Sequence, residues 1–238
     1  MLYFLLALFA LMWAIFIVYV IKGKRLEGFY FKGLTSFLFV AIFAYGVYKF
    51  VSEPSYGPQV LIFDTIYVYL IIFVMLGLVS GLMGDLFLEV QWFYKQRRNY
   101  TIKQGMVIFL VGHVFYILAI SIFVGFNYIS LMIGLLMTLL VYIGSKLMKL
   151  DFENLKVMTY LYTFVIFTMV GSTIFQAIDL SFNGYSILFM IGAILFGVSD
   201  LLLAPIYFKN ETKKRFVVAN LATYYLGQCL IALAFSFL

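Results

Sequence analysis

The chain has 238 residues, of which 66% are hydrophobic and only 11% are charged, and its formal net charge is +6. Soluble domains carry roughly a quarter charged residues, so this composition excludes an ordinary soluble fold and predicts an integral membrane protein. The single cysteine, Cys229, excludes a disulfide framework and a cysteine-based metal site.

Uncharged apolar runs recur along almost the whole chain, separated by charged or turn-rich clusters. Most are about 20 residues long, the length of a transmembrane helix. We therefore expect an all-α fold, with residues 1–238 forming a single transmembrane helical domain of about eight spans. These spans are about Met1–Ile21, Phe29–Tyr48, Leu61–Trp92, Gln104–Phe126, Tyr128–Ser145, Val157–Ile178, Ser186–Tyr207 and Phe216–Leu238. Because the turn at Gly125-Phe126-Asn127 is very short, a seven-helix count is the alternative.

The basic residues cluster in alternate loops, those after the first, third, fifth and seventh spans, and Lys49 is the only basic residue in the other loops. The positive-inside rule places these basic loops in the cytoplasm and both termini on the extracytoplasmic side. Basic loops beside anionic lipid headgroups account for the net charge, so no nucleic-acid partner is expected. The composition, short loops and compact length favour a bacterial inner membrane.

A few polar residues lie inside the spans, where ionisable groups are costly and are functional candidates by default. They are Asp85, His113, Asp200, Tyr224, Tyr225 and Gln228. Counting from the nearest basic loop residue at about 1.5 Å per residue places Asp85, His113, Asp200 and Tyr225 at one depth of roughly 14 to 15 Å. This agreement predicts a polar chamber in the cytoplasmic half of the bilayer.

The same residues also have structural interpretations. Either aspartate alone could be a carboxyl group held by Ser80, Ser199 or a tyrosine, and His113 could be an interhelical hydrogen-bonder instead of a proton carrier.

Four charged residues lie nearer the span ends. Lys32 is only about one turn inside the second span, where snorkelling to the surface is the simplest expectation. Asp64, Glu89 and Asp179 are expected to be solvated or capping groups near the interfaces.

The two aspartates have similar sequence surroundings. Gly84-Asp85-Leu86-Phe87-Leu88 echoes Ser199-Asp200-Leu201-Leu202-Leu203, and small residues that favour close helix packing precede both. A parallel four-plus-four helix repeat would bring equivalent residues to equal depth. The alternative is a chance match of short apolar segments.

Further motifs follow one another along nearly the whole chain. They are Gly77-Leu78 with Ser80, Gly84-Asp85 and Leu88; Phe109 with His113 and Tyr116; Gly192-Ala193 with Phe196, Ser199-Asp200 and Ala204; and Tyr225 with Gln228. In this order they resemble the signatures of the YhhN family, which includes the lysoplasmalogenases. Lys32, and Tyr162 with Met169, are weaker matches. Gly33 and Gly227 stand where the family tends to have proline and alanine.

The resemblance implies hydrolysis of the vinyl ether bond of lysoplasmalogens, which releases a fatty aldehyde and glycerophosphoethanolamine or glycerophosphocholine. This chemistry needs a proton delivered to the alkene carbon and then water added to the oxocarbenium ion. A positioned acid and a carboxylate suffice, so no serine nucleophile, metal or organic cofactor is required. Two carboxyl groups in one dry chamber favour one protonated and one ionised group. Our hypothesis is that Asp85 and Asp200 form this catalytic pair, with either one as the acid.

The remaining candidates are expected to bind or orient the substrate. They are Lys32, Ser80, His113, Tyr116, Tyr162, Ser199, Tyr225 and Gln228. Among them, Lys32 would meet the phosphate of the lysophospholipid from the cytoplasmic side, while the alkenyl chain lies between apolar helices in contact with membrane lipids.

Other functions remain open. A proton-coupled transporter or lipid-binding protein could use the same buried Asp and His residues, although apart from Pro205 the spans contain no interior proline. A family member could also act on another lysophospholipid or ether lipid. A zinc hydrolase would need more than one histidine. An intramembrane aspartyl protease would need a G-x-G-D motif, whereas Leu82-Met83 precede Gly84-Asp85.

Overall fold

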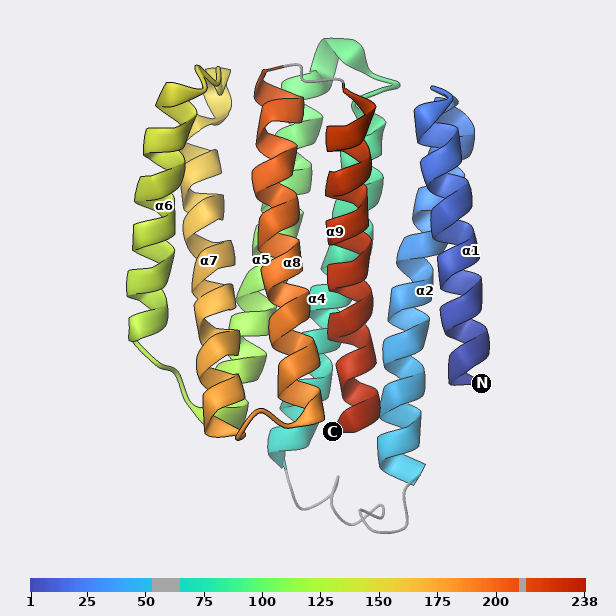
Figure 1. The fold of residues 1–238 in the computed structure, drawn as a ribbon, viewed down its shortest axis with the longest axis vertical. Helices are drawn as coiled ribbons and strands as arrows, with labels where there is room; N and C mark the ends of the chain where they lie inside the picture. Colours follow the sequence, from blue (N-terminus) through green and yellow to red (C-terminus); the bar gives the residue numbers. More distant parts are fainter. Residues whose placement is uncertain (53–64, 210–212) are drawn as a thin grey trace.

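The structure, a computed structural model, describes residues 1–52, 65–209 and 213–238. Within these ranges eight helices are long and apolar enough to cross a membrane, which confirms the predicted all-α fold (Figure 1). They are α1 (Leu2–Ile21), α2 (Arg25–Ser52), α4 (Thr65–Val90), α5 (Arg98–Val124), α6 (Ile129–Leu147), α7 (Lys156–Asp179), α8 (Gly184–Phe208) and α9 (Lys214–Ala234). Short 3-10 turns occur at Lys95–Arg97, Glu153–Leu155 and Phe235–Phe237. The third span was expected to start at Leu61, which lies outside the described residues, as does Asp64.

The short turn between α5 and α6 favours eight spans over seven. The α5 helix ends at Val124, and Gly125 follows with a φ of 89°, a conformation that glycine adopts without steric cost. The side chain of Asn127 then accepts a hydrogen bond from the backbone N–H of Ile129 at 2.9 Å, at the start of α6. Two helices can therefore reverse direction within these few residues.

Both chain termini lie at one end of the bundle (Figure 1). The connections after α1, α4 and α6, the end of α8 and the start of α9 lie at the opposite end, which we call the basic end because the basic clusters of the sequence fall there. This agrees with the prediction that the termini share a side; which side of the membrane they occupy stays a prediction. The helices α2 and α5 begin earlier than expected, at Arg25 and Arg98, because hydropathy marks the hydrocarbon core whereas helical hydrogen bonding continues beyond it.

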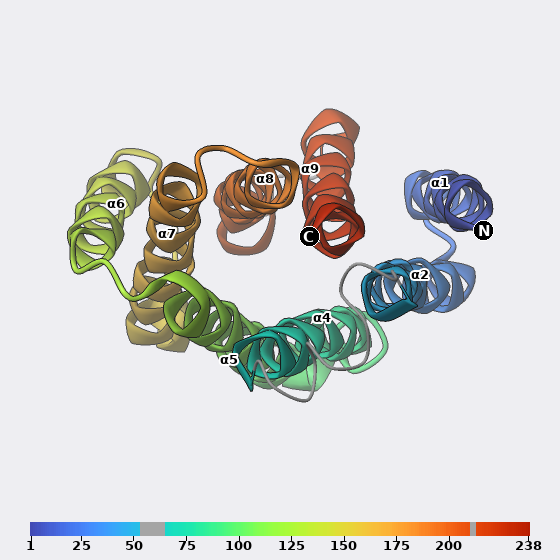
Figure 2. The same cartoon turned by 90° about the horizontal axis from the view of Figure 1, so that it is seen from below.

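The two halves of the bundle pack in the same way. In the first half α1 contacts α2, α2 contacts α4 and α4 contacts α5; in the second half α6, α7, α8 and α9 repeat these contacts in order (Figure 2). The halves join where α5 packs on α7 and α9 packs on α2. This pattern supports the four-plus-four repeat suggested by the aspartate motifs.

Close backbone crossings recur at equivalent positions of the two halves. A Cβ atom added to Gly112 would lie 3.2 Å from the carbonyl oxygen of Gly77, between α5 and α4. A Cβ atom added to Gly227 would lie 2.7 Å from the carbonyl oxygen of Gly192, between α9 and α8. The second pair follows the first by the same number of positions as the second aspartate follows the first. Each aspartate therefore follows the first glycine of its own crossing by the same number of residues.

Aromatic side chains fill the interior between α5 and the α8–α9 pair. Phe109 packs edge-on against Phe196 and Tyr224, each at a ring distance of 6.0 Å. Farther from the basic end, Tyr116 packs edge-on against Phe189 at 5.8 Å. Phe109 and Tyr224 also line the cavity described next.

Candidate functional site

A cavity of about 450 Å³ extends from the basic end into the bundle. Both predicted catalytic residues, Asp85 on α4 and Asp200 on α8, line it, and Asp85 is only 2% exposed. The volume lies within the roughly 300–1,000 Å³ that is usual for small-molecule sites. The structure thus brings the two aspartates to one cavity.

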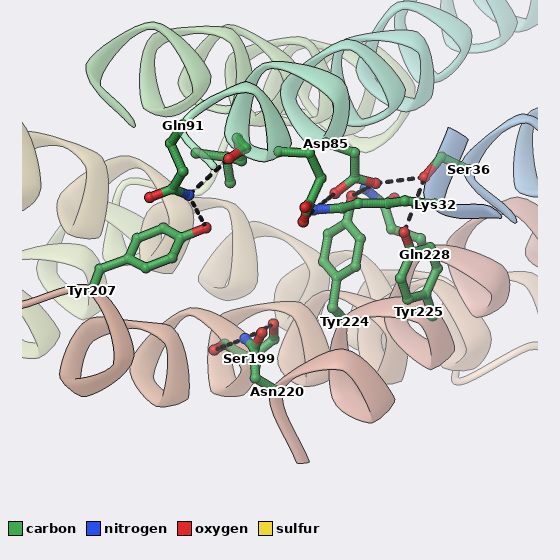
Figure 3. Close-up of polar contacts among 12 residues, drawn as sticks. Lys32, Ser36, Asp85, Gln91, Ser199, Tyr207, Asn220, Tyr224, Tyr225 and Gln228 are labelled. Atoms are coloured by element: carbon green, nitrogen blue, oxygen red, sulfur yellow. Dashed lines mark hydrogen bonds and ion pairs between the residues drawn. The ribbon is translucent and has the colours of Figure 1, made fainter. Parts of the chain in front are cut away.

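Donors from two helices, α2 and α9, converge on Asp85 (Figure 3). The hydroxyl groups of Ser36 and Tyr224 donate to Oδ2 at 2.6 and 2.8 Å, and Nζ of Lys32 lies 3.4 Å from Oδ1. The Ser36 oxygen also lies 3.2 Å from the hydroxyl of Tyr225. A buried carboxylate anion is stabilised by this kind of surrounding, in which hydrogen bonds accompany an opposite charge.

Lys32 is buried, so the expectation that it snorkels to the surface is wrong. Its Nζ lies 3.1 Å from Glu89 and 3.4 Å from Asp85, and its side chain is 6% exposed. Glu89, expected to be a solvated or capping group, is instead part of this network, with a side chain 13% exposed. Asp85 and Glu89 lie four residues apart on one face of α4, so a single ammonium group can meet both carboxylates.

Asp200 has a different environment. The hydroxyl of Tyr162, on α7, donates to its Oδ2, and no cation pairs with it among the described residues. His113 packs edge-on against the Tyr162 ring at 5.4 Å, and its Nδ1 is bonded to the carbonyl oxygen of Phe109. His113 is therefore placed behind the wall of the cavity and is separated from Asp200 by Tyr162.

Among the predicted binding residues, Ser199 lines the cavity. Its hydroxyl and carbonyl oxygens accept hydrogen bonds from Asn220 at 3.0 and 2.8 Å, which ties α8 to α9 beside Asp200 (Figure 3). Asn220 was missed by sequence reasoning, although an amide inside an apolar span is a polar signal of the kind used for the other residues.

Gln228 and Tyr116 lie behind Tyr224. The Tyr116 hydroxyl donates to Oε1 of Gln228 at 3.3 Å, and Nε2 of Gln228 is 3.5 Å from the Tyr224 hydroxyl. They therefore act on Asp85 only through Tyr224. Ser80 is not brought to the site: it packs at the α4–α5 crossing, against the position of Gly112.

Ser36 was also missed. It lies four residues after Lys32, on the same face of α2, and the two side chains meet opposite oxygens of Asp85. The spacing of the lysine and the serine by one helical turn can be read from the sequence. The carboxylate that they share is revealed only by the packing of α2 on α4.

In the part of the chain that the structure describes, no cluster of three or more His, Cys, Asp or Glu side chains could hold a metal ion. Comparison with known proteins gives one family: the model of the YhhN family matches residues 71–235. No curated protein and no solved structure matched the chain. The matched residues run from α4 to α9 and include both aspartates, whereas Lys32 and Ser36 lie outside them.

Proposed function

This chain belongs to the YhhN family, and from that premise we propose that it is a lysoplasmalogenase-like intramembrane hydrolase. It cleaves the vinyl ether bond of lysoplasmalogens, which yields a fatty aldehyde and glycerophosphoethanolamine or glycerophosphocholine. The observation that supports this most is that two aspartates in contrasting environments line one cavity, one beside a buried lysine and the other beside a phenol.

Asp85 is assigned the role of the carboxylate. Its two oxygens face an ammonium group and two hydroxyl donors, which favour the ionised form. In the reaction this negative charge stabilises the oxocarbenium ion and then accepts a proton from the attacking water.

Asp200 is assigned the role of the acid. A carboxyl group without a cation partner in a water-poor site is cheaper in its neutral form. Tyr162 binds its Oδ2, so the hydroxyl hydrogen of the neutral group is placed on Oδ1. The two residues thereby divide acid and base functions by environment, although they are the same residue type.

Water is the only reactant that the reaction needs besides the lipid. The proton of Asp200 is added to the alkene carbon farther from the ether oxygen, and the electron pair of that oxygen forms the oxocarbenium ion. Water adds to the oxocarbenium carbon as Asp85 takes one of its protons. The resulting hemiacetal breaks its bond to the glycerol oxygen, which takes the proton held by Asp85. The other fragment leaves as the aldehyde when the hemiacetal hydroxyl gives up its proton. Return of the remaining proton to Asp200 restores the resting state.

The rest of the cavity suits a single hydrocarbon chain. Apolar side chains from α1 and α7, among them Phe16, Ile166 and Phe167, line it beside the polar residues. The protein is a multi-pass membrane protein. We assign it to the bacterial inner membrane, with the basic end in the cytoplasm.

The test is the release of aldehyde by the purified protein from three matched lysophospholipids that differ only in the bond to the chain. The vinyl ether substrate is expected to give aldehyde, whereas the saturated alkyl ether and the acyl ester are expected to give none. Release of fatty acid from the acyl ester, or no turnover of choline and ethanolamine vinyl ethers alike, would refute the proposal.

A further inference from the structure

The cavity has an outer rim at the basic end that the catalytic residues do not use. Its lining there includes the cationic side chains of Arg25 and Arg98 and the aromatic side chains of Trp92 and Tyr207. We propose that this rim binds the phosphodiester of the lysophospholipid headgroup, with Arg25 and Arg98 as the phosphate ligands. The inference rests on the proposed function, because it names the part of the substrate that this end of the site holds.

Both arginines are held in place by neighbouring groups. The guanidinium of Arg25 lies over the Trp92 ring, 3.8 Å from its centroid. Stacking of this kind uses the face of the guanidinium and leaves its N–H groups, which point outward in the plane, able to bind phosphate oxygens in pairs. Nη2 of Arg98, at the start of α5, donates to the carbonyl oxygen of Tyr207 at 2.8 Å. No carboxylate of the described residues forms an ion pair with either arginine.

The Tyr207 anchor is itself fixed by the turn that follows α4. Nε2 of Gln91, a residue only 1% exposed, donates to the Tyr207 hydroxyl at 3.0 Å and to the carbonyl oxygen of Leu88 at 2.7 Å (Figure 3). The position of Arg98 is thus set by contacts among α4, α5 and α8. A donor that is already positioned loses less entropy when it binds an anion.

Charge separates the rim from the floor of the cavity. At the floor, one lysine faces two carboxylates, Asp85 and Glu89, so this cluster repels an anion. Lys32 was expected to bind the phosphate, but the two carboxylates already compensate its charge. Arg25 and Arg98 take this role instead. At the rim the side chains are cationic, so a phosphodiester is drawn there and the uncharged ether end of the lipid is left to face the aspartates.

The spacing fits one glycerophospholipid. From Asp200 to Tyr207 on α8 the helix rises about 10 Å at roughly 1.5 Å per residue, and Trp92 lies in the turn that follows the end of α4. A glycerophosphate unit together with the side chain of one arginine covers this distance. The bound phosphate thereby places the vinyl ether, and not the headgroup or the chain, between the two aspartates.

The experiment compares two lipids that share one hydrocarbon chain and that vinyl ether hydrolysis cannot consume: hexadecyl glycerophosphocholine and hexadecyl glycerol, which lacks the phosphate. Binding is followed by tryptophan fluorescence in detergent, in a Trp13→Phe background, where Trp92 at the rim is the remaining tryptophan. We expect the wild-type rim to bind the phospholipid at least about 10-fold more tightly than the alcohol, since charge-assisted hydrogen bonds to phosphate contribute this much.

The variants Arg25→Gln and Arg98→Gln are each expected to reduce that affinity ratio about 5-fold or more, with the affinity for hexadecyl glycerol unchanged. Arg97→Gln is the matched control, because Arg97 is adjacent and exposed and does not line the cavity. The proposal is overturned if the wild type binds the two lipids alike, or if either cavity variant leaves the ratio unchanged. The wild-type comparison decides this even where a variant does not fold. Because no turnover is measured, failure here is distinct from failure of the proposed hydrolysis.

Discussion

Replacing Lys32 with methionine tests the buried ion-pair network at the floor of the cavity. The substitution keeps the length of the side chain and leaves Asp85 and Glu89 without the cation that lies 3.4 and 3.1 Å from them. At an effective dielectric constant of about 20, one such pair attracts by about 5 kcal/mol. Desolvation offsets part of this, and removing one partner of a buried pair costs about 3–5 kcal/mol. We take about 3 kcal/mol, because Glu89 is partly exposed.

For a chain of this length, 1 kcal/mol corresponds to roughly 2–4 °C in Tm, so Lys32→Met is expected to lower Tm by about 6–12 °C. The assay is thermal unfolding of the purified protein in detergent, followed by intrinsic fluorescence. The control is Lys24→Met, since Lys24 pairs with Glu27 at 3.7 Å on the surface and should change Tm by less than about 2 °C. Adding Glu89→Gln to Lys32→Met should recover part of the loss. A Tm for Lys32→Met within about 2 °C of the wild type would refute the network and restore the snorkelling interpretation.

Four further substitutions follow from the packing and the site. Gly192→Ala is expected to lower Tm, because its Cβ atom would lie 2.7 Å from a backbone oxygen of α9. The Cβ atom of the control, Gly144→Ala, meets nothing within 4 Å, so this variant should raise stability by about 0.5–1 kcal/mol. Equal shifts in Tm for the two variants would contradict the close crossing at Gly192. Tyr162→Phe should lower kcat for aldehyde release about 10-fold with little change in KM, because Asp200 loses its hydrogen-bond donor. An unchanged kcat would show that Tyr162 does not support Asp200 in catalysis. Ser80→Ala should leave that kcat within about twofold, and a larger loss would return Ser80 to the site.

The fold was largely predictable because the hydrocarbon core imposes span length and charge imposes loop position. The turn at Gly125 shows this, since one glycine with a positive φ separates two spans that hydropathy alone could have merged. The meeting of Asp85 and Asp200 in one chamber was also predictable, because counting along straight helices from basic loops needs no knowledge of packing. Both residues line one cavity in the structure.

Lateral contacts were not predictable from this sequence alone. Lys32 and Glu89 both lie near helix ends, where a charged side chain can reach water or a partner at similar cost, and only the packing of α2 on α4 decides between them. Ser80 shows the opposite error. It lies near Asp85 in the sequence, but it packs at the α4–α5 crossing. Ser80 and Asp85 are five residues apart, and residues at this spacing on a helix do not share a face.

Aldehyde release from a lysoplasmalogen by the wild type, Asp85→Asn and Asp200→Asn tests the central claim most directly. Asp179→Asn is the matched control, because Asp179 is exposed at the far end of α7 and does not line the cavity. We predict that each cavity variant loses at least about 100-fold in kcat, as expected when a general acid or base is removed, while it still folds and gives a cooperative thermal transition. The control should turn over normally. Wild-type rates in a folded Asp85→Asn or Asp200→Asn protein would contradict the division of acid and base roles between the two aspartates.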